Sequence, residues 1–205
     1  MRRTFADLDA ELLLRLANRN DITVAMRAHF IRDAVLNIAM LFRHPELELN
    51  ATETLALGDD FLAPTATDIW FPSSLRNETD DYLLRLEARE RVERSSLKPT
   101  APPYTYFWYR RVFFFEAKAN TAKQIKIWYK RKPVEFSSSA NCELDELFDI
   151  FIVMDAARIG FETVRDLDEA EKQLALFSAE AQRKKIPLDQ AKLDDYRQGF
   201  RVRTR

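Results

Sequence analysis

Hydrophobic residues recur every three or four positions through the first 43 residues, which is the spacing of an amphipathic helix. The first stretch begins at Thr4, which can form a capping box with Asp7, and continues to a turn signal at residues 18–21. A second stretch with the same spacing covers residues 22–43. The pattern therefore predicts an antiparallel helical hairpin over residues 5–43.

The pattern changes to alternating apolar and polar residues at Leu47 and keeps this period up to a turn signal at residues 58–60. A short strand is predicted over residues 68–71. Residues 80–94 then place acidic residues and arginines four positions apart, which favours a helix whose apolar face is thin. We expect a β-rich middle over residues 47–133 that carries this segment as a surface helix.

The densest group of aromatic residues in the chain lies at residues 104–115. Aromatic residues favour strands, so this stretch predicts a β-hairpin with its turn near Arg110 and Arg111. A third strand is predicted over residues 124–130, with Ile125, Ile127 and Tyr129 on one face and Lys126, Trp128 and Lys130 on the other. Both faces of the hairpin are apolar, with Phe107, Tyr109, Phe113 and Phe115 alternating with Tyr106, Trp108, Val112 and Phe114. Either helices cover both faces, or one face is buried by another subunit.

The last third of the chain returns to the helical period. One helix is predicted over residues 143–164 and a final one over residues 167–185, which Asp166 and Glu169 would start as a capping box. Beyond it, residues 187–205 lack an apolar stripe and end in an acid-free stretch that carries Arg197, Arg201, Arg203 and Arg205. This segment is expected to be an arm rather than part of a core.

Together these patterns predict an α+β fold. The expected architecture is mainly an α-helical bundle with a small antiparallel β-sheet and a flexible C-terminal arm. One domain would cover residues 1–186, and the arm residues 187–205.

The composition is that of a globular domain, and it argues against two classes of function, general nucleic-acid binding and membrane insertion. The chain has 205 residues, of which 46% are hydrophobic and 32% charged. Its 32 basic and 33 acidic residues give a net charge of −1, which argues against a protein whose whole surface grips nucleic acid. No segment has the length of a transmembrane helix, and acidic residues interrupt any N-terminal signal pattern, so we expect a protein made inside the cell.

The low numbers of cysteine, histidine and glycine disfavour several kinds of catalytic and binding site. One cysteine cannot form an internal disulfide, and two histidines make a histidine-based metal site or a catalytic triad improbable. Three scattered glycines do not supply a phosphate-binding loop. We therefore expect no enzyme and no cofactor.

Two groups of acidic residues could still be functional. The first is the set Glu143, Asp145, Glu146 and Asp149, but acids in the first turns of a helix are what the helix dipole favours. The second is Asp155, a lone carboxylate in an apolar stretch, which needs a partner such as Arg158 or Arg32. A structural ion pair is the favoured interpretation over a catalytic acid.

A basic and aromatic group offers an alternative function, nucleic-acid binding. Lys123, Lys126, Lys130, Arg131 and Lys132 flank Trp128 and Tyr129, and such a strand edge could stack and neutralise a single strand. The RNA-recognition signature, however, needs glycine among its aromatics, and Arg111-Val112-Phe113-Phe114-Phe115 has none. Lysines on an edge strand also protect against aggregation.

The order of elements resembles a known family, the head–tail adaptor (connector) proteins of tailed bacteriophages. The resemblance covers about residues 5–185. It rests on the helical hairpin, the proline-led aromatic hairpin, the strand that ends in Trp128-Tyr129-Lys130-Arg131-Lys132-Pro133, and the acid-started helix with Phe148 that continues into Ala156-Ala157. The chain departs from the family pattern at Arg110-Arg111, where the hairpin turn usually carries a glycine.

The resemblance implies a virion structural protein without chemistry. Such adaptors form a ring, typically twelvefold, beneath the portal protein. They extend the channel through which genomic DNA passes, without sequence-specific binding, and present a docking surface to the next tail or neck protein. The implied location is the head–tail interface of the virion, after assembly in the host cytoplasm.

The resemblance also suggests which residues make contacts. A C-terminal segment that lies along the portal would place Tyr196, Phe200, Arg201, Arg203 and Arg205 as portal contacts. A ring needs two different patches on each subunit. The candidates are the aromatic hairpin, its neighbouring strand and the charged segment 80–94, with Tyr106, Trp108, Phe114, Trp128, Arg85 and Arg89 as the expected subunit interface.

Overall fold

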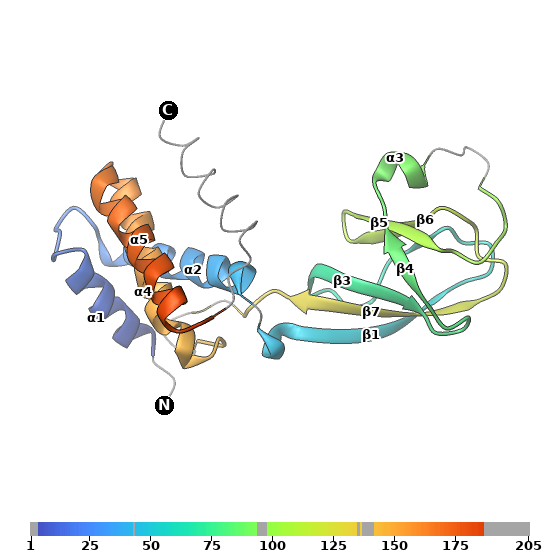
Figure 1. Ribbon diagram of the computed structural model, residues 1–205, viewed down its shortest axis with the longest axis horizontal. Coiled ribbons are helices and arrows are strands. Elements are labelled where there is room, and N and C mark those ends of the chain that lie inside the picture. The colour runs from blue at the N-terminus through green and yellow to red at the C-terminus, as the bar shows by residue number, and fades with distance from the viewer. Residues whose placement is uncertain (1–3, 43, 94–97, 135, 137–141, 187–205) are drawn as a thin grey trace. The chain divides into compact units, whose positions relative to one another are not determined.

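The computed structural model describes residues 4–42, 44–93, 98–134, 136 and 142–186, and they fall into two compact units (Figure 1). The helical unit comprises the described residues of 1–44 and 133–205, and the sheet unit those of 45–132. The chain thus leaves the helical unit once, builds the sheet unit, and returns.

The N-terminal helices of the helical unit confirm the sequence pattern. Helix α1 is Phe5–Arg15, and Thr4 and Asp7 form the expected capping box at its start. Helix α2 is Val24–Leu41, and the Thr23 hydroxyl caps it by accepting from the Met26 N–H.

Of the two predicted C-terminal helices, the first begins later than residue 143 and the second begins at Leu167 as predicted. A 3₁₀ turn, η2 (Glu146–Phe148), leads into α4 (Asp149–Thr163), and α5 is Leu167–Arg183. The predicted capping box at Asp166 is wrong, because the Asp166 side chain makes no cap hydrogen bond. Its carboxylate instead accepts from the Arg19 guanidinium at 3.2 Å, so a tertiary ion pair replaces the local cap.

Helix α4 is the centre of the helical core. It contacts α1, α2 and α5, and residues on every side of it are buried. A Cβ on Gly160 would lie 3.0 Å from Leu16 Cδ2 and 3.4 Å from the Phe30 ring, so the absent side chain lets neighbouring residues approach the helix. The largest fully buried side chains of this core include Leu8, Leu12, Leu16, Ile31, Ile38, Phe151 and Phe177.

The sheet unit contains seven strands. After a 3₁₀ turn, η1 (Pro45–Leu47), the strands are β1 (Glu48–Leu55), β2 (Phe61–Leu62), β3 (Ile69–Asn77), β4 (Tyr82–Leu86), β5 (Thr105–Tyr109), β6 (Val112–Phe115) and β7 (Lys123–Arg131), with the short helix α3 (Arg89–Val92) after β4. Their order in the sheet is β1-β7-β3-β4-β5-β6-β2. All neighbouring strands are antiparallel except β4 and β5, which run parallel.

The predicted fold class is therefore wrong. The sheet is mixed and nearly closed into a barrel, and helix and strand make up 41% and 26% of the described residues, so it is not a small antiparallel sheet beside a dominant helical bundle. The error has a physical origin, because strands that pair here lie far apart in sequence. Glu48 of β1, for example, pairs with Lys130 of β7, and no local pattern reports such a partner.

The predicted surface helix over residues 80–94 is also wrong. Residues 82–86 form β4, with Leu84 buried between the exposed Leu83 and Arg85, and only Arg89–Val92 is helical. The ion pair Glu87–Arg91 does form at four residues' separation, but pairing of β4 with both β3 and β5 overrides the helical signal.

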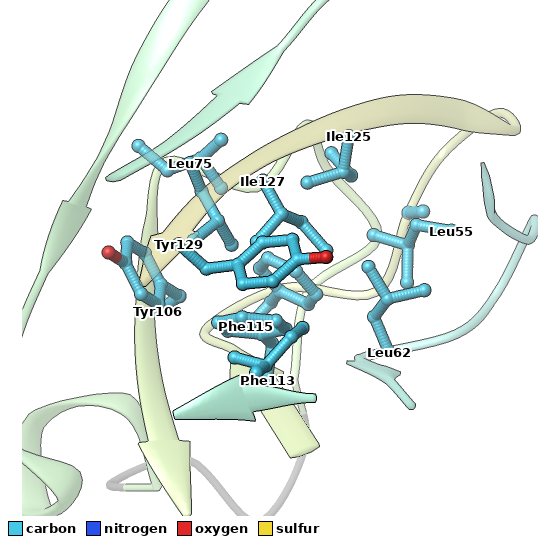
Figure 2. Packing of buried hydrophobic residues seen from close by; sticks show 12 residues of the cluster. Leu55, Leu62, Leu75, Tyr106, Phe113, Phe115, Ile125, Ile127 and Tyr129 are labelled. Atoms are coloured by element: carbon cyan, nitrogen blue, oxygen red, sulfur yellow. The ribbon is translucent and has the colours of Figure 1, made fainter. Parts of the chain in front are cut away.

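The core of the sheet unit lies inside the curved sheet (Figure 2). Each of the seven strands contributes side chains to this core, and Phe113, Phe115 and Ile127 are fully buried. The members labelled in the figure are Leu55, Leu62, Leu75, Tyr106, Phe113, Phe115, Ile125, Ile127 and Tyr129. The predicted alternation of β7 is confirmed, because Ile125, Ile127 and Tyr129 all face this core.

The aromatic hairpin and its turn are confirmed, but the expected grouping of its faces is wrong. The two-residue turn at Arg110 and Arg111 pairs Trp108 with Phe113 and Phe107 with Phe114. Paired residues share a face, so Tyr106, Trp108, Phe113 and Phe115 form one face and Phe107, Tyr109, Val112 and Phe114 the other.

Candidate assembly surfaces

The inner face of the β5–β6 hairpin is part of the core. Tyr106 is only 3% exposed, and burial raises the pKa of its hydroxyl. Tyr106 therefore offers no surface to another subunit, which corrects its expected place in an interface. Trp108 is half-buried and packs on Phe113 with ring centroids 4.3 Å apart.

The outer face of the hairpin is covered only in part. The rings of Phe107 and Phe114 stack at 4.9 Å with an interplanar angle of 12°, and Phe114 remains half-exposed. Helix α3 contacts β5, and its Val92 is buried. The sheet interior thus buries one face of the hairpin and α3 covers a portion of the other, so the expectation that helices cover both faces is wrong. Burial of a face by another subunit stays a prediction.

The two arginines of the expected interface are both exposed. Arg85 lies on β4 and has no hydrogen bond or ion pair from its side chain to the described residues. Arg89 begins α3, donates to Glu93 at 2.8 Å, and holds its guanidinium 5.1 Å from the centre of the Tyr109 ring. Their charges therefore remain on the surface of the sheet unit.

Trp128 lies on the outer face of the sheet, opposite the core-facing residues of β7. It is half-buried between Asn50 of β1 and Ser74 of β3. The Lys126 ammonium lies 5.2 Å from its ring centre, a cation–π arrangement. Phe71, 46% exposed, pairs with Lys130 on the adjoining strand. This outer face combines aromatic and basic groups as the sequence suggested.

The basic group around Trp128 is partly neutralised. Lys123 is buried and forms an ion pair with Asp80 at 2.7 Å, and Lys126 lies 3.5 Å from Glu78. A lysine held in a buried pair cannot neutralise a phosphate without losing its partner. These pairs weaken the nucleic-acid alternative, which depends on the free charge of this group.

The isolated Asp155 has found the partner that its environment requires. It is 2% exposed, accepts from Arg158 at 2.8 Å and from Asn37 at 2.8 Å, and Arg158 also pairs with Glu162. Burial raises the pKa of Asp155, while Arg158 and Asn37 act in the opposite direction. Asp155 and Arg158 form a buried ion pair within α4, as the structural interpretation predicted, and the hydrogen bond from Asn37 connects this pair to α2.

The acidic residues before α4 have local structural roles. The Asp145 carboxylate accepts from the Leu147 N–H at 2.8 Å, Glu143 accepts from the Val134 N–H at 2.8 Å, and Asp149 is buried. Within the described ranges, no group of three or more His, Cys, Asp or Glu side chains could hold a metal ion.

One surface feature was missed at the level of the sequence. Arg110 and Arg111 were expected only as a turn, yet both side chains are exposed and Arg110 lies 5.2 Å from the centre of the Tyr109 ring. The residue types could have indicated this feature, because a two-residue hairpin turn favours asparagine and glycine and here contains two arginines. The expected portal contacts Tyr196, Phe200, Arg201, Arg203 and Arg205 lie outside the described residues.

The exposed surface of the sheet unit has the composition of a protein-binding surface. Exposed or half-exposed Trp, Tyr, Phe and Arg side chains are enriched at protein–protein interfaces, and all four residue types occur here. The helices of the described residues include none with the length and apolar character needed to cross a membrane.

The comparison with protein families agrees. A family model described as SU10 adaptor protein matches residues 3–203, and the chain belongs to this family. The resemblance to phage head–tail adaptors is thereby confirmed, and the protein is a bacteriophage adaptor and a virion component. No curated protein matches the chain.

Proposed function

We propose that this adaptor forms a ring, twelvefold by analogy with the resembling family, beneath the portal protein at the head–tail interface. The ring extends the DNA channel and presents a docking surface to the next tail or neck protein. The family match over residues 3–203 carries this proposal, because it spans both compact units and most of the C-terminal segment. The protein acts without catalysis and without a cofactor, and it assembles in the host cytoplasm.

The proposed contacts divide into two sets. The C-terminal residues Tyr196, Phe200, Arg201, Arg203 and Arg205 bind the portal. Neighbouring subunits meet through residues of the sheet unit, namely Trp108, Phe114, Trp128, Arg85 and Arg89. Exposed arginines and half-buried aromatic rings support this second set, because such groups are enriched where interfaces concentrate their binding energy.

The portal contact is tested by deleting residues 188–205. The chain ending at residue 187 should keep its helical circular dichroism and its tryptophan fluorescence but no longer co-purify with the portal protein of its own source. A full-length variant with Arg201, Arg203 and Arg205 each changed to alanine serves as the matched comparison and should also lose attachment. Undiminished attachment of the truncated chain would refute the assignment of the arm.

The nucleic-acid alternative makes a different prediction. If the outer face around Trp128 bound DNA, the isolated protein would bind an oligonucleotide with an affinity that falls steeply with salt. The adaptor proposal expects binding too weak to show such a dependence, since Lys123 and Lys126 are paired with acids.

A further inference from the structure

The turn between β5 and β6 has a backbone conformation that its residues disfavour. Arg110 has φ of 48° and Arg111 φ of 65°, so both residues lie in the left-handed region. A two-residue hairpin turn of this kind normally uses asparagine and glycine, because other side chains are strained there. The two arginines at the tip of the hairpin therefore adopt a strained backbone conformation that asparagine and glycine would adopt more easily. At a hairpin tip, where asparagine and glycine would relieve the strain, two retained arginines indicate a role for their side chains.

The tip is organised for contact with an anion. The guanidinium groups of Arg89 and Arg110 lie 5.1 and 5.2 Å from the centre of the Tyr109 ring, which is 41% exposed. Arg89 also donates a hydrogen bond to Glu93, so its charge is partly neutralised. Arg110 and Arg111 form no ion pair or hydrogen bond from their side chains to the described residues. Two guanidinium groups are thus exposed and unneutralised on a short, paired hairpin.

A protein surface fits this tip better than a nucleic acid does. Two free cations would neutralise few phosphates, and affinity for DNA grows with the number of neutralised phosphates. A tyrosine beside arginines on a paired hairpin instead has the composition of an interface hot spot, and a guanidinium can bind a carboxylate through two hydrogen bonds.

A matching pair of carboxylates exists on this chain. Asp168 and Glu171 lie three residues apart on α5, so their side chains are neighbours on the helix surface. Both are exposed, and neither forms an ion pair or hydrogen bond to a described residue. The adjoining Lys172 is held by Glu169, which reduces its repulsion of an approaching arginine.

We propose that Arg110 and Arg111 at the β5–β6 tip of one copy bind Asp168 and Glu171 on α5 of a second copy. The contact joins two different patches, so it is of the head-to-tail type that builds a ring. The proposal rests on the proposed ring and adds a specific contact to it, and none of the four residues Arg110, Arg111, Asp168 and Glu171 is among the interface residues of the proposed function.

The strain at the tip permits a sharp test. The full-length variant Arg110→Asn/Arg111→Gly supplies the residues that the turn prefers, so it should fold at least as stably as the natural chain while losing both charges. When it is co-expressed with the portal, self-association should weaken by about tenfold or more. A matched control is Arg165→Gly, since Arg165 also has a positive φ, of 61°, and an exposed side chain, but lies outside the proposed contact. That variant should assemble normally.

The proposed contact between the two arginines and the two carboxylates is tested by exchanging their charges. Arg110→Glu/Arg111→Glu and Asp168→Lys/Glu171→Lys should each abolish assembly, and the chain carrying all four substitutions should recover it. Assembly by the Arg110→Asn/Arg111→Gly variant at the natural level would overturn the role of the tip. Failure of the four-substitution chain would overturn the assignment of Asp168 and Glu171. Failure of the natural chain itself to assemble on the portal would instead refute the proposed function, so the two failures are distinguishable.

The same purified proteins can be tested for DNA binding, which separates a protein partner from a phosphate-bearing one. Binding of a 20-base-pair duplex by the natural chain, lost in the Arg110→Asn/Arg111→Gly variant, would overturn the protein partner in favour of phosphate. The proposal expects the two proteins to bind the duplex equally weakly.

Discussion

The two units of the protein bury polar groups in different ways. The helical unit encloses charges as pairs, Arg27 with Asp9 and Arg158 with Asp155, and both arginines are less than a tenth exposed. The sheet unit has a mostly apolar interior, where the buried cation Lys123 reaches Asp80 near its edge. Removing one member of a buried charge pair leaves the other charge without that partner, whereas truncating an apolar core residue leaves a cavity. The two units should therefore lose stability by different mechanisms.

The units also differ in a way that makes them separately observable. All 3 tryptophans of the chain, Trp70, Trp108 and Trp128, belong to the sheet unit. Tryptophan fluorescence therefore reports the sheet unit, while circular dichroism at 222 nm is dominated by the helices. If each unit folds as its own cooperative element, a substitution in one should move only the signal of that unit.

The largest effect is expected from Phe115→Ala in the sheet unit. Phe115 is fully buried in the core of the sheet, and its removal leaves a cavity that costs about 3–5 kcal/mol of unfolding free energy. Denaturant unfolding followed by fluorescence should shift accordingly, while the 222 nm transition stays in place. Phe61→Ala, on a residue 50% exposed, is the control and should change little. Equal shifts of both signals would show that the units unfold together.

A loss of about 3 kcal/mol is expected from Asp155→Ala in the helical unit. The substitution removes the carboxylate that Arg158 and Asn37 bind, so the buried guanidinium of Arg158 loses one acidic partner and keeps Glu162 beside it. The 222 nm transition should move and the fluorescence transition should not. Asp168→Ala, on the exposed surface of α5, provides the matched carboxylate control. A neutral outcome for Asp155→Ala would mean that the pair contributes little to the stability of the helices.

A loss of about 1 kcal/mol is expected from Tyr82→Phe, again in the sheet unit alone. The Tyr82 hydroxyl donates to the Pro103 carbonyl at 2.7 Å and accepts from Asn77 at 3.0 Å. Burial is the main cause that raises the pKa of Tyr82 to about 12, from 10.0 in the unfolded chain. The stability that this shift contributes is present below pH 10 and is lost as pH rises from 10 to about 12.

The pH dependence provides the check on Tyr82. The natural chain should lose more stability than Tyr82→Phe between these two pH values, as measured by fluorescence-monitored unfolding. Burial also raises the pKa of Tyr106 and Tyr129, so only the difference between the two proteins isolates Tyr82. Identical alkaline profiles would contradict the hydrogen-bonded environment of this hydroxyl.

The smallest effects come from a pair of glycine substitutions, one in each unit. Arg111 and Arg165 both have positive φ, and replacing either with glycine should stabilise its own unit by about 1 kcal/mol or less. Arg111→Gly should move the fluorescence transition and Arg165→Gly the 222 nm transition. A destabilising result at either site would mean that its arginine side chain makes a contact worth more than the backbone strain.

The helical unit could be predicted from the sequence because its information is local. The spacing of Leu8 and Leu12 and the capping pair Thr4 and Asp7 indicate a helix without reference to any other segment. The need of Asp155 for a partner likewise followed from its apolar neighbours, and Arg158 lies one turn away. The Asp166 cap failed for the opposite reason, because Arg19, remote in the sequence, binds its carboxylate.

The sheet unit could be predicted only where pairing is local. The β5–β6 hairpin and the alternation of β7 were found, since both show in short stretches of residues. The closure of the sheet was not, because it depends on partners such as Glu48 and Lys130. The helix predicted over residues 80–94 is wrong for the same reason. The charge spacing favours a helix, but pairing with β3 and β5 makes Tyr82–Leu86 a strand. Tyr106 was assigned to a surface because nothing local shows that the sheet curves around it.

The most direct test of the central claim is the mass of the assembly formed when the full-length chain is co-expressed with the portal protein of its own source. Native mass spectrometry of the purified portal gives this mass and hence the number of bound chains. The account predicts a portal ring that carries many copies of the chain in a fixed ratio. A 24.0 kDa species that separates from the portal would contradict it.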